Sequence, residues 1–462
     1  MKLRSILFSL TILHLISISG IFVSGCAQIG MPTGGVTDTL APKLIRATPA
    51  VGSRNVTSNK ITLEFDEYID VNDLQQNLLI SPLQNRNPSI VANPRSITLK
   101  FRDSLLPNTT YSINFGNAVR DINENNVLKN LTYVFSTGSS LDSLSLSGNV
   151  TLAETGGTDS TLIVLLYRNA VDSTVKSKKP NYVAKVNADG AFAFTNLPAD
   201  SFKIYALKDG DGSKTYNSLS EIFAFNEDEI STLNSETVSL LAYAQELPKE
   251  NKTGSISKPV VDKKLKVTNN ILGSKDLLEP LELTFNNPLK VIDTTKIYLA
   301  DTLFRKITGV RYTTDSTAKK IIINTNWKPE DNLVLIIDKE AAQDSADNQL
   351  AKSDTVRFTN KRTEDYGKLT IRFNELDLSK NPVIQFVVGE NVKFSYPIVS
   401  SSYTNTLFPP GEYTVRILYD KDKNGKWTPG NYSKKIQPEI VVGLPQKLSV
   451  RADWDNEREI NL

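Results

Sequence analysis

The stretch Asn59–Phe65, with the sequence NKITLEF, decides the fold class of this 462-residue chain. Ile61, Leu63 and Phe65 alternate with polar residues, which is the period of a strand with one buried face. The pattern returns about 220 residues later, at 279–285, as EPLELTF. A strand pattern that returns after so long an interval predicts an internal repeat of strand-built modules.

The residues that follow this stretch repeat as well. Residues 105–128, LLPNTTYSINFGNAVRDINENNVL, return at 326–350 as NWKPEDNLVLIIDKEAAQDSADNQL, so that Asp121 corresponds to Asp344. We call the repeated unit type A. Its polar turn residues lie between alternating runs, as expected for short strands joined by tight turns.

A second kind of unit, type B, follows each A unit. Residues 196–216, NLPADSFKIYALKDGDGSKTY, return at 407–427 as LFPPGEYTVRILYDKDKNGKW. No stretch behind the N-terminal segment sustains a helical period, so we expect an all-β fold of four tandem antiparallel β-sandwich domains in the order A-B-A-B. The expected ranges are a signal peptide at 1–25, a flexible tether at 26–40, A domains at 41–138 and 259–361, and B domains at 139–250 and 363–462.

The N-terminal segment reads as an export signal. Lys2 and Arg4 precede a long apolar and hydroxyl-bearing run, which is the order of a signal peptide. Small residues follow at once instead of the basic flank that a transmembrane anchor would need. Val23–Cys26, VSGC, resembles the lipobox of bacterial lipoproteins, and this resemblance implies cleavage between Gly25 and Cys26 and a lipid on Cys26. An ordinary secretory signal with an incidental cysteine is the alternative.

Removal of the signal changes the chemistry open to the chain. Cleavage takes away the one histidine, His14, and two of the 53 basic residues, and leaves 51 basic and 51 acidic residues. A lipidated Cys26 leaves no free thiol, so Ser-His-Asp catalysis, Cys-His catalysis and histidine or cysteine metal sites are excluded. The balanced charge predicts no nucleic-acid partner. An enzyme would have to work with carboxylates alone, and we expect none.

Both units resemble known families. The A unit, on residues 38–70 (DTLAPKLIRATPAVGSRNVTSNKITLEFDEYID), resembles the SbsA-type bacterial Ig-like domain over 41–138; the second copy departs from it at 286–288. The B unit, on 186–209 (VNADGAFAFTNLPADSFKIYALKD), is similar to the transthyretin-like or carboxypeptidase-regulatory-like β-sandwich of Bacteroidetes envelope proteins. The stretch 32–38, PTGGVTD, is similar to lipoproteins of that group.

These resemblances imply a scaffold. We expect a non-catalytic lipoprotein that is held at the outer membrane by its lipid and presents its sandwiches to a protein partner. Ala27, where inner-membrane retention usually has Asp, favours the outer membrane, and we expect the periplasmic face. The alternative is a glycan-binding lipoprotein, which would need exposed aromatic platforms. Trp327 and Trp427 occupy repeat positions and are expected in cores instead.

The B units share an Asp-rich loop that directly follows a strand. Acidic and polar oxygens at positions 1, 3 and 5 resemble the opening half of a calcium loop. Position 12, which should supply a bidentate glutamate, holds Ser220 in one copy and Asn431 in the other, and only Glu221 lies nearby. The loops are therefore either weak calcium sites or tight hairpins, and no other cofactor is expected. The candidate ligands are Asp209, Asp211, Ser213, Asp420, Asp422 and Asn424.

Overall fold

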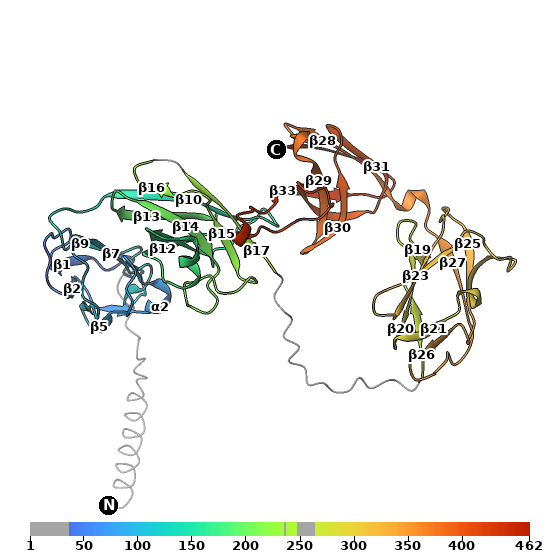
Figure 1. The fold of residues 1–462 in the computed structure, drawn as a ribbon, viewed down its shortest axis with the longest axis horizontal. Helices are drawn as coiled ribbons and strands as arrows, with labels where there is room; N and C mark the ends of the chain where they lie inside the picture. The colour runs from blue at the N-terminus through green and yellow to red at the C-terminus, as the bar shows by residue number, and fades with distance from the viewer. Residues whose placement is uncertain (1–36, 235–236, 247–263) are drawn as a thin grey trace, which may run out of the picture. The chain divides into compact units, whose positions relative to one another are not determined.

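The computed structural model describes residues 37–234, 237–246 and 264–462. Within these ranges almost all regular structure is β-strand (Figure 1), so the predicted all-β fold of tandem β-sandwiches is confirmed. In the described part of the chain, no helix has the length and apolar character needed to cross a membrane. The short helical segments there are α2 (Leu74–Asn77), η1 (Asp172–Lys176), η2 (Thr294–Lys296), η3 (Thr363–Asp365), η4 (Leu378–Lys380) and η5 (Tyr432–Lys434).

The chain divides into two compact units. The first contains the residues up to Ile80 and residues 84–141, and the second contains 81–83 and 142–462. The finer boundaries expected from the internal repeats stay predictions.

Sandwich A1, strands β1–β9, is built around the stretch that opened the sequence analysis. Ile61, Leu63 and Phe65 on β2 are 1, 2 and 1% exposed, and they pack in one apolar core with Tyr111 and Phe135. Its sheets have the strand orders β1-β2-β6-β5, β4-β7-β9 and β3-β8. The strands are β1 (Leu44–Thr48), β2 (Lys60–Phe65), β3 (Ile69–Val71), β4 (Leu79–Ser81), β5 (Ser89–Asn93), β6 (Ser96–Lys100), β7 (Thr110–Asn114), β8 (Val119–Asp121) and β9 (Thr132–Ser136).

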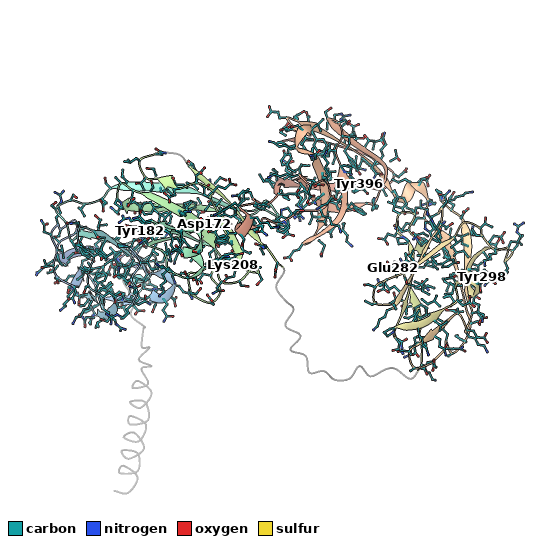
Figure 2. All side chains as sticks on the ribbon, in the orientation of Figure 1. Asp172, Tyr182, Lys208, Glu282, Tyr298 and Tyr396 are labelled. Carbon is teal, nitrogen blue, oxygen red and sulfur yellow. The ribbon has the colours of Figure 1, made fainter. Side chains whose placement is uncertain are left out.

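Sandwich B1, strands β10–β17, wraps one continuous sheet around its core. The order is β12-β11-β14-β15-β17-β10-β13, with β16 beside β14. Inward-facing side chains such as Tyr182, labelled in Figure 2, fill the space between the layers. The strands are β10 (Leu144–Leu152), β11 (Ile163–Arg168), β12 (Tyr182–Lys185), β13 (Ala191–Leu197), β14 (Ser201–Leu207), β15 (Ile222–Phe225), β16 (Ile230–Ser231) and β17 (Val238–Ala244).

Sandwich A2, strands β18–β27, faces the sheet β18-β20-β24-β23 with the sheet β19-β27-β25-β22, and adds the pair β21-β26. Leu281, Leu283 and Phe285, the repeat of the A1 pattern, are again buried in its core. The strands are β18 (Val267–Asn269), β19 (Ser274–Lys275), β20 (Leu281–Phe285), β21 (Leu289–Ile292), β22 (Ile297–Asp301), β23 (Arg311–Thr314), β24 (Lys320–Asn324), β25 (Asn332–Ile337), β26 (Ala342–Asp344) and β27 (Asp354–Asn360).

Sandwich B2, strands β28–β34, packs the sheet β31-β28-β34 against the sheet β30-β29-β32-β33. Its core includes Leu369, Ile384 and Phe408, each with no exposed surface. The strands are β28 (Gly367–Asn374), β29 (Pro382–Val388), β30 (Asn391–Pro397), β31 (Ser402–Phe408), β32 (Gly411–Tyr419), β33 (Ile440–Val450) and β34 (Asp455–Asn461).

The sandwiches are mainly antiparallel, but three pairs of described strands run parallel, which the sequence analysis did not anticipate. In B1 and in B2 the first and last strands pair in this way, β10 with β17 and β28 with β34. In A2 the parallel pair is β19 with β27. Strands joined by a long crossover can pair parallel because nothing forces them to turn back on each other.

Candidate functional site

The predicted cleavage point at Gly25 and the predicted lipid attachment at Cys26 lie outside the described residues. Both therefore stay predictions. The two Asp-rich loops of the B sandwiches lie within the described residues.

Both loops make the same turn. The first follows β14 and the second follows β32. In each, the aspartate at position 1 accepts a hydrogen bond from the backbone N–H at position 6: Lys214 N donates to Asp209 Oδ1 at 3.1 Å, and Gly425 N donates to Asp420 Oδ2 at 2.8 Å. Both position-6 residues have positive φ, 57° and 74°. The internal repeat therefore extends to the hydrogen bonding of the loop.

The second loop brings three carboxylates together. Ligand oxygens of Asp420, Asp422 and Glu439 lie within 4.8 Å of one another, and Asp420 and Glu439 are buried. Glu439 immediately precedes β33 and accepts hydrogen bonds from Lys421 N at 2.6 Å and Thr428 N at 2.9 Å. It was missed by the sequence analysis because it lies outside the loop, where spacing within the loop gives no signal for it.

Hydrogen bonds keep the exposed member of this cluster ionised. The Thr428 hydroxyl donates to Asp422 Oδ2 at 2.8 Å, and this bond is the main cause that lowers the pKa of Asp422. Asn424, a predicted ligand, contributes differently. Its Nδ2 donates to Asp422 Oδ2 while its Oδ1 accepts from Lys426 N, so its oxygen is already engaged within the turn.

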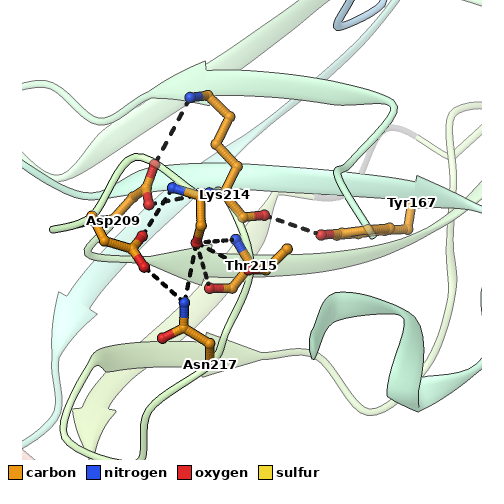
Figure 3. Close-up of polar contacts among 7 residues, drawn as sticks. Tyr167, Asp209, Lys214, Thr215 and Asn217 are labelled. Atoms are coloured by element: carbon orange, nitrogen blue, oxygen red, sulfur yellow. Dashed lines mark hydrogen bonds and ion pairs between the residues drawn. The ribbon is translucent and has the colours of Figure 1, made fainter. Parts of the chain in front are cut away.

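In the first loop a lysine neutralises the position-1 aspartate. Lys214, at the position that Gly425 holds in the second loop, places its Nζ 3.9 Å from Asp209 Oδ2 (Figure 3). Asp211 accepts from the backbone N–H of Ser213 at 2.9 Å, and this bond is the main cause that lowers the pKa of Asp211 to about 2. A cation bound by Asp209 would have to compete with this lysine ammonium.

The remaining polar groups of the first loop bond one another. Ser213 Oγ accepts hydrogen bonds from Thr215 and Asn217, which are both labelled in Figure 3. Glu221, the only acid expected near position 12, instead accepts the N–H groups of Asn217 and Ser218 and so caps the next turn. This network is typical of a hairpin closed by its own side chains.

Of the two loops, the second has the donor set that suits a hard cation. Carboxylate oxygens are the ligands that Ca²⁺ prefers, at about 2.3–2.6 Å, and three such groups within 4.8 Å can converge on one ion. Among the described residues, a group of three acidic ligands occurs at this loop and not at the first. Calcium stays a prediction, and the residues that would hold it are Asp420, Asp422 and Glu439.

The short helix η5 carries a second feature, a contact with sandwich B1 that we call the B1–B2 contact. Tyr432 is 3% exposed, and its ring centroid lies 5.1 Å from those of Phe223 and Phe225 on β15. Its hydroxyl donates to the carbonyl of Asp172 at 2.7 Å and lies 3.1 Å from the hydroxyl of Tyr205. Burial raises the pKa of Tyr432. The side chain therefore fills an aromatic socket and is hydrogen-bonded at its polar end.

Charged and main-chain groups surround this socket. The carboxylate of Asp172 is paired with Lys203 of B1 and with Lys435 of B2, at 2.5 and 2.8 Å, and these lysines lower the pKa of Asp172. The backbone N–H of Val441 donates to the carbonyl of Ala153 at 3.0 Å. The contact thus combines aromatic packing, a shared ion pair and a main-chain hydrogen bond.

Exposed aromatic side chains are few and are covered on one face. Among the described residues, Tyr68, Phe304 and Trp454 are 52, 52 and 59% exposed. An arginine lies over each ring, with its guanidinium carbon 4.6, 5.6 and 5.1 Å from the centroid. Trp327 and Trp427 pack against apolar clusters, as expected. The three exposed rings each keep one face free of an arginine, so the glycan-binding alternative stays a prediction.

Comparison with known families gives a match for one module. Residues 38–137 match the model of the Bacterial Ig-like domain. The chain therefore contains a bacterial Ig-like domain there, in agreement with the resemblance noted for 41–138. The chain matches no curated protein.

Solved structures give distant likenesses. Alpha-2-macroglobulin of Escherichia coli is 14% identical, with 39% of this chain and 72% of that chain covered and a TM-score of 0.20. The S-layer protein SbsC is 12% identical, with 90% of this chain and 54% of that chain covered and a TM-score of 0.17. The major pilin subunit of Bacillus cereus is 10% identical, with 69% of this chain and 99% of that chain covered and a TM-score of 0.17. Scores this low carry no argument about fold or function.

Proposed function

We propose that the chain is a non-catalytic envelope lipoprotein, anchored at the outer membrane by a lipid on Cys26, that presents its sandwiches to a protein partner. The expected lipid modification supplies the membrane attachment, since two or more acyl chains hold a protein durably at a bilayer. The sandwiches supply stiff surfaces for a partner. Catalysis is not part of this proposal.

The observation that carries the proposal is the B1–B2 contact. Tyr432 and Phe223 belong to modules that are separated along the chain by all of A2, yet they pack at a ring separation of 5.1 Å. Buried tyrosines and charge pairs cost side-chain entropy and desolvation, so a chain that places them between modules gains fixed geometry from them. Fixed geometry between modules is what a scaffold needs.

A capture experiment tests the partner. The full chain with its native signal would carry an affinity tag at the C-terminus, and the complex would be captured from detergent-solubilised envelopes after cross-linking. We expect a stoichiometric outer-membrane protein. The matched control is Cys26→Ser, which leaves every described strand unchanged and removes the acyl acceptor; it should appear in the soluble fraction and capture less of the partner. Equal outer-membrane recovery of this variant would contradict the lipid anchor.

Protease treatment of intact cells tests the proposed face. A chain in the periplasm is shielded by the outer membrane, so externally added protease should leave it whole until the membrane is permeabilised. Degradation before permeabilisation would place the modules on the cell surface instead.

A further inference from the structure

The two B sandwiches differ along one side. In B1, β15 lies beside β14 and pairs with β17, which pairs in turn with β10, so the sheet continues without a break from β14 to β10. The internal repeat makes β32 the counterpart of β14, and the parallel pair β28–β34 corresponds to β10–β17. In B2, however, among the described strands β33 pairs with β32 alone and β34 pairs with β28 alone. Each of these two strands therefore has a free edge.

A cavity of about 160 Å³ is lined by residues of both of these strands. A void of about 150 Å³ holds a benzene molecule in another protein, so one aliphatic or aromatic side chain would fill this cavity. Arg458 on β34 also lines it. This residue has the inward parity of the buried Ile460 but is itself exposed, so the cavity reaches the surface there. The apolar residues that line the cavity are Ile371, Val415, Leu444, Pro445, Leu448 and Ile460.

The edge of β33 is poorly suited to a further strand. Opposite Val415 of β32, β33 has three residues, 444–446, so it bulges there. One of the three is Pro445, which has no N–H to donate to a neighbouring strand. Before the bulge, the N–H of Val441 already donates to the carbonyl of Ala153 in B1. A strand that enters the gap would therefore pair with β34.

The outward face of β34 is acidic. Its alternate, exposed positions are Asp455, Glu457 and Glu459. The first two carboxylates are paired with Lys368 and Arg372 of β28, at 3.1 and 2.8 Å. Glu459 instead has a neutral partner, because it accepts a hydrogen bond from Asn374 Nδ2 at 2.7 Å. Glu459 also lines the cavity, so the charge that β28 does not neutralise lies next to the gap.

We propose that β34 binds, as an added strand, an extended segment of a partner protein in which basic and apolar residues alternate. The main chain of the segment pairs with the free edge of β34, a basic side chain lies beside Glu459 on the outward face, and an apolar side chain on the other face fills the cavity. A second copy of β34 fits less well, because two copies paired antiparallel about a two-fold axis would set acidic residues against one another on the outward face. This inference rests on the proposed function, in which the sandwiches are presented to a protein partner, and adds the surface and the kind of segment that it takes.

Binding of short synthetic peptides to the purified chain tests the proposal. The probe is a fluorescent peptide of alternating lysine and valine, and the control peptide has the same composition in an order without alternation. Anisotropy should show saturable binding of the alternating peptide alone. Glu459→Lys should weaken it by about fivefold, because repulsion replaces attraction at an exposed site. The matched control Glu390→Lys changes an exposed acid between β29 and β30, at the other edge of the same sandwich, and should bind as wild type. A photo-reactive phenylalanine at the central valine position should cross-link to the segments around Leu448 or Ile460.

Three results would overturn the proposal. If millimolar peptide does not bind, Pro445 and the inward Arg458 serve instead to keep two edges from pairing. Binding that Glu459→Lys leaves unchanged, with cross-links elsewhere, would show that the peptide does not use this edge. A dimer cross-linked through β34 would assign the edge to a second copy of the chain. Because the peptide is tested on the chain alone, its failure leaves the lipid anchor and the outer-membrane partner to be decided by the capture experiment.

Discussion

In both A sandwiches, an aspartate at the same repeat position accepts the hydrogen bonds of a turn. Asp121 and Asp344, which correspond in sequence, are 1 and 0% exposed. Asp121 accepts three successive backbone N–H groups that follow it, and Asp344 accepts two backbone N–H groups and the side-chain amide of Asn348. Bonds from Asn348 are the main cause that lowers the pKa of Asp344 to about 2. One buried carboxylate thus organises each of these turns.

Asp344→Asn should therefore destabilise A2 in a pH-dependent manner. Because the folded-state pKa lies below the unfolded value of about 3.9, the carboxylate contributes stability above pH 4, and this contribution is lost as the pH falls toward 2. The melting temperature of the variant should lie several degrees below wild type at pH 7 and converge with it near pH 2. The exposed neighbour Asp347→Asn is the control and should stay near wild type. A melting difference that is the same at both pH values would show that the charge does not matter.

The two Asp-rich loops should differ in their response to calcium. Millimolar Ca²⁺ should raise the melting temperature of the full chain, because an ion that binds only the folded state stabilises it. Asp422→Ala should abolish the rise, whereas Asp211→Ala should leave it intact because Lys214 already neutralises the first loop. The affinity should be that of extracellular modules, with a dissociation constant of about 10⁻⁴ to 10⁻³ M. If Ca²⁺ does not change the melting temperature, both loops are tight hairpins and not calcium sites.

Strands were predictable where their pattern is local. The alternation in NKITLEF places β2 correctly, because one buried face imposes period 2 on the sequence. The parallel pair β10–β17 was not predictable, since alternation shows which face is buried and not which distant strand lies alongside. Glu439 was missed for the same reason: it reaches the second loop from a part of the chain that no spacing within the loop specifies.

Gly148 on β10 shows how tightly this parallel pair is packed. A Cβ added there would lie 2.1 Å from the carbonyl oxygen of Val238 on β17, so Gly148→Ala forces the backbones apart. We expect it to lower the free energy of unfolding of B1 by roughly 1–3 kcal/mol, measured by chemical denaturation. Gly210→Ala, where the added carbon meets nothing within 4 Å, is the control. Equal denaturation midpoints for the two variants would contradict a close approach of β10 and β17.

For the chain as a whole, the B1–B2 contact should hold the half that contains A1 and B1 to the half that contains A2 and B2 without a covalent link. A protease site inserted between residues 250 and 258 allows the chain to be cut between B1 and A2. After cleavage we expect the halves to co-elute in size-exclusion chromatography. Tyr432→Ala should separate them, because removal of a buried interface aromatic costs at least about 2 kcal/mol.

Two further variants sharpen that result. Tyr432→Phe keeps the ring in its socket and loses only the hydroxyl's bonds to Asp172 and Tyr205, so the halves should stay together but dissociate faster. Lys434→Ala changes an exposed neighbour and should behave as wild type. If cleaved wild-type halves separate immediately, the contact does not persist in solution.

The same contact also decides how tension would pass along the chain. If the two ends of the chain were pulled apart, load that enters B2 would cross to B1 through Tyr432 and the Asp172–Lys435 pair, and would bypass the A2 residues that lie between B1 and B2 in the sequence. A2 would bear force only after the contact ruptures. After rupture, the part of the chain between B1 and B2 would join the path that carries the load, so the distance between the two ends could increase.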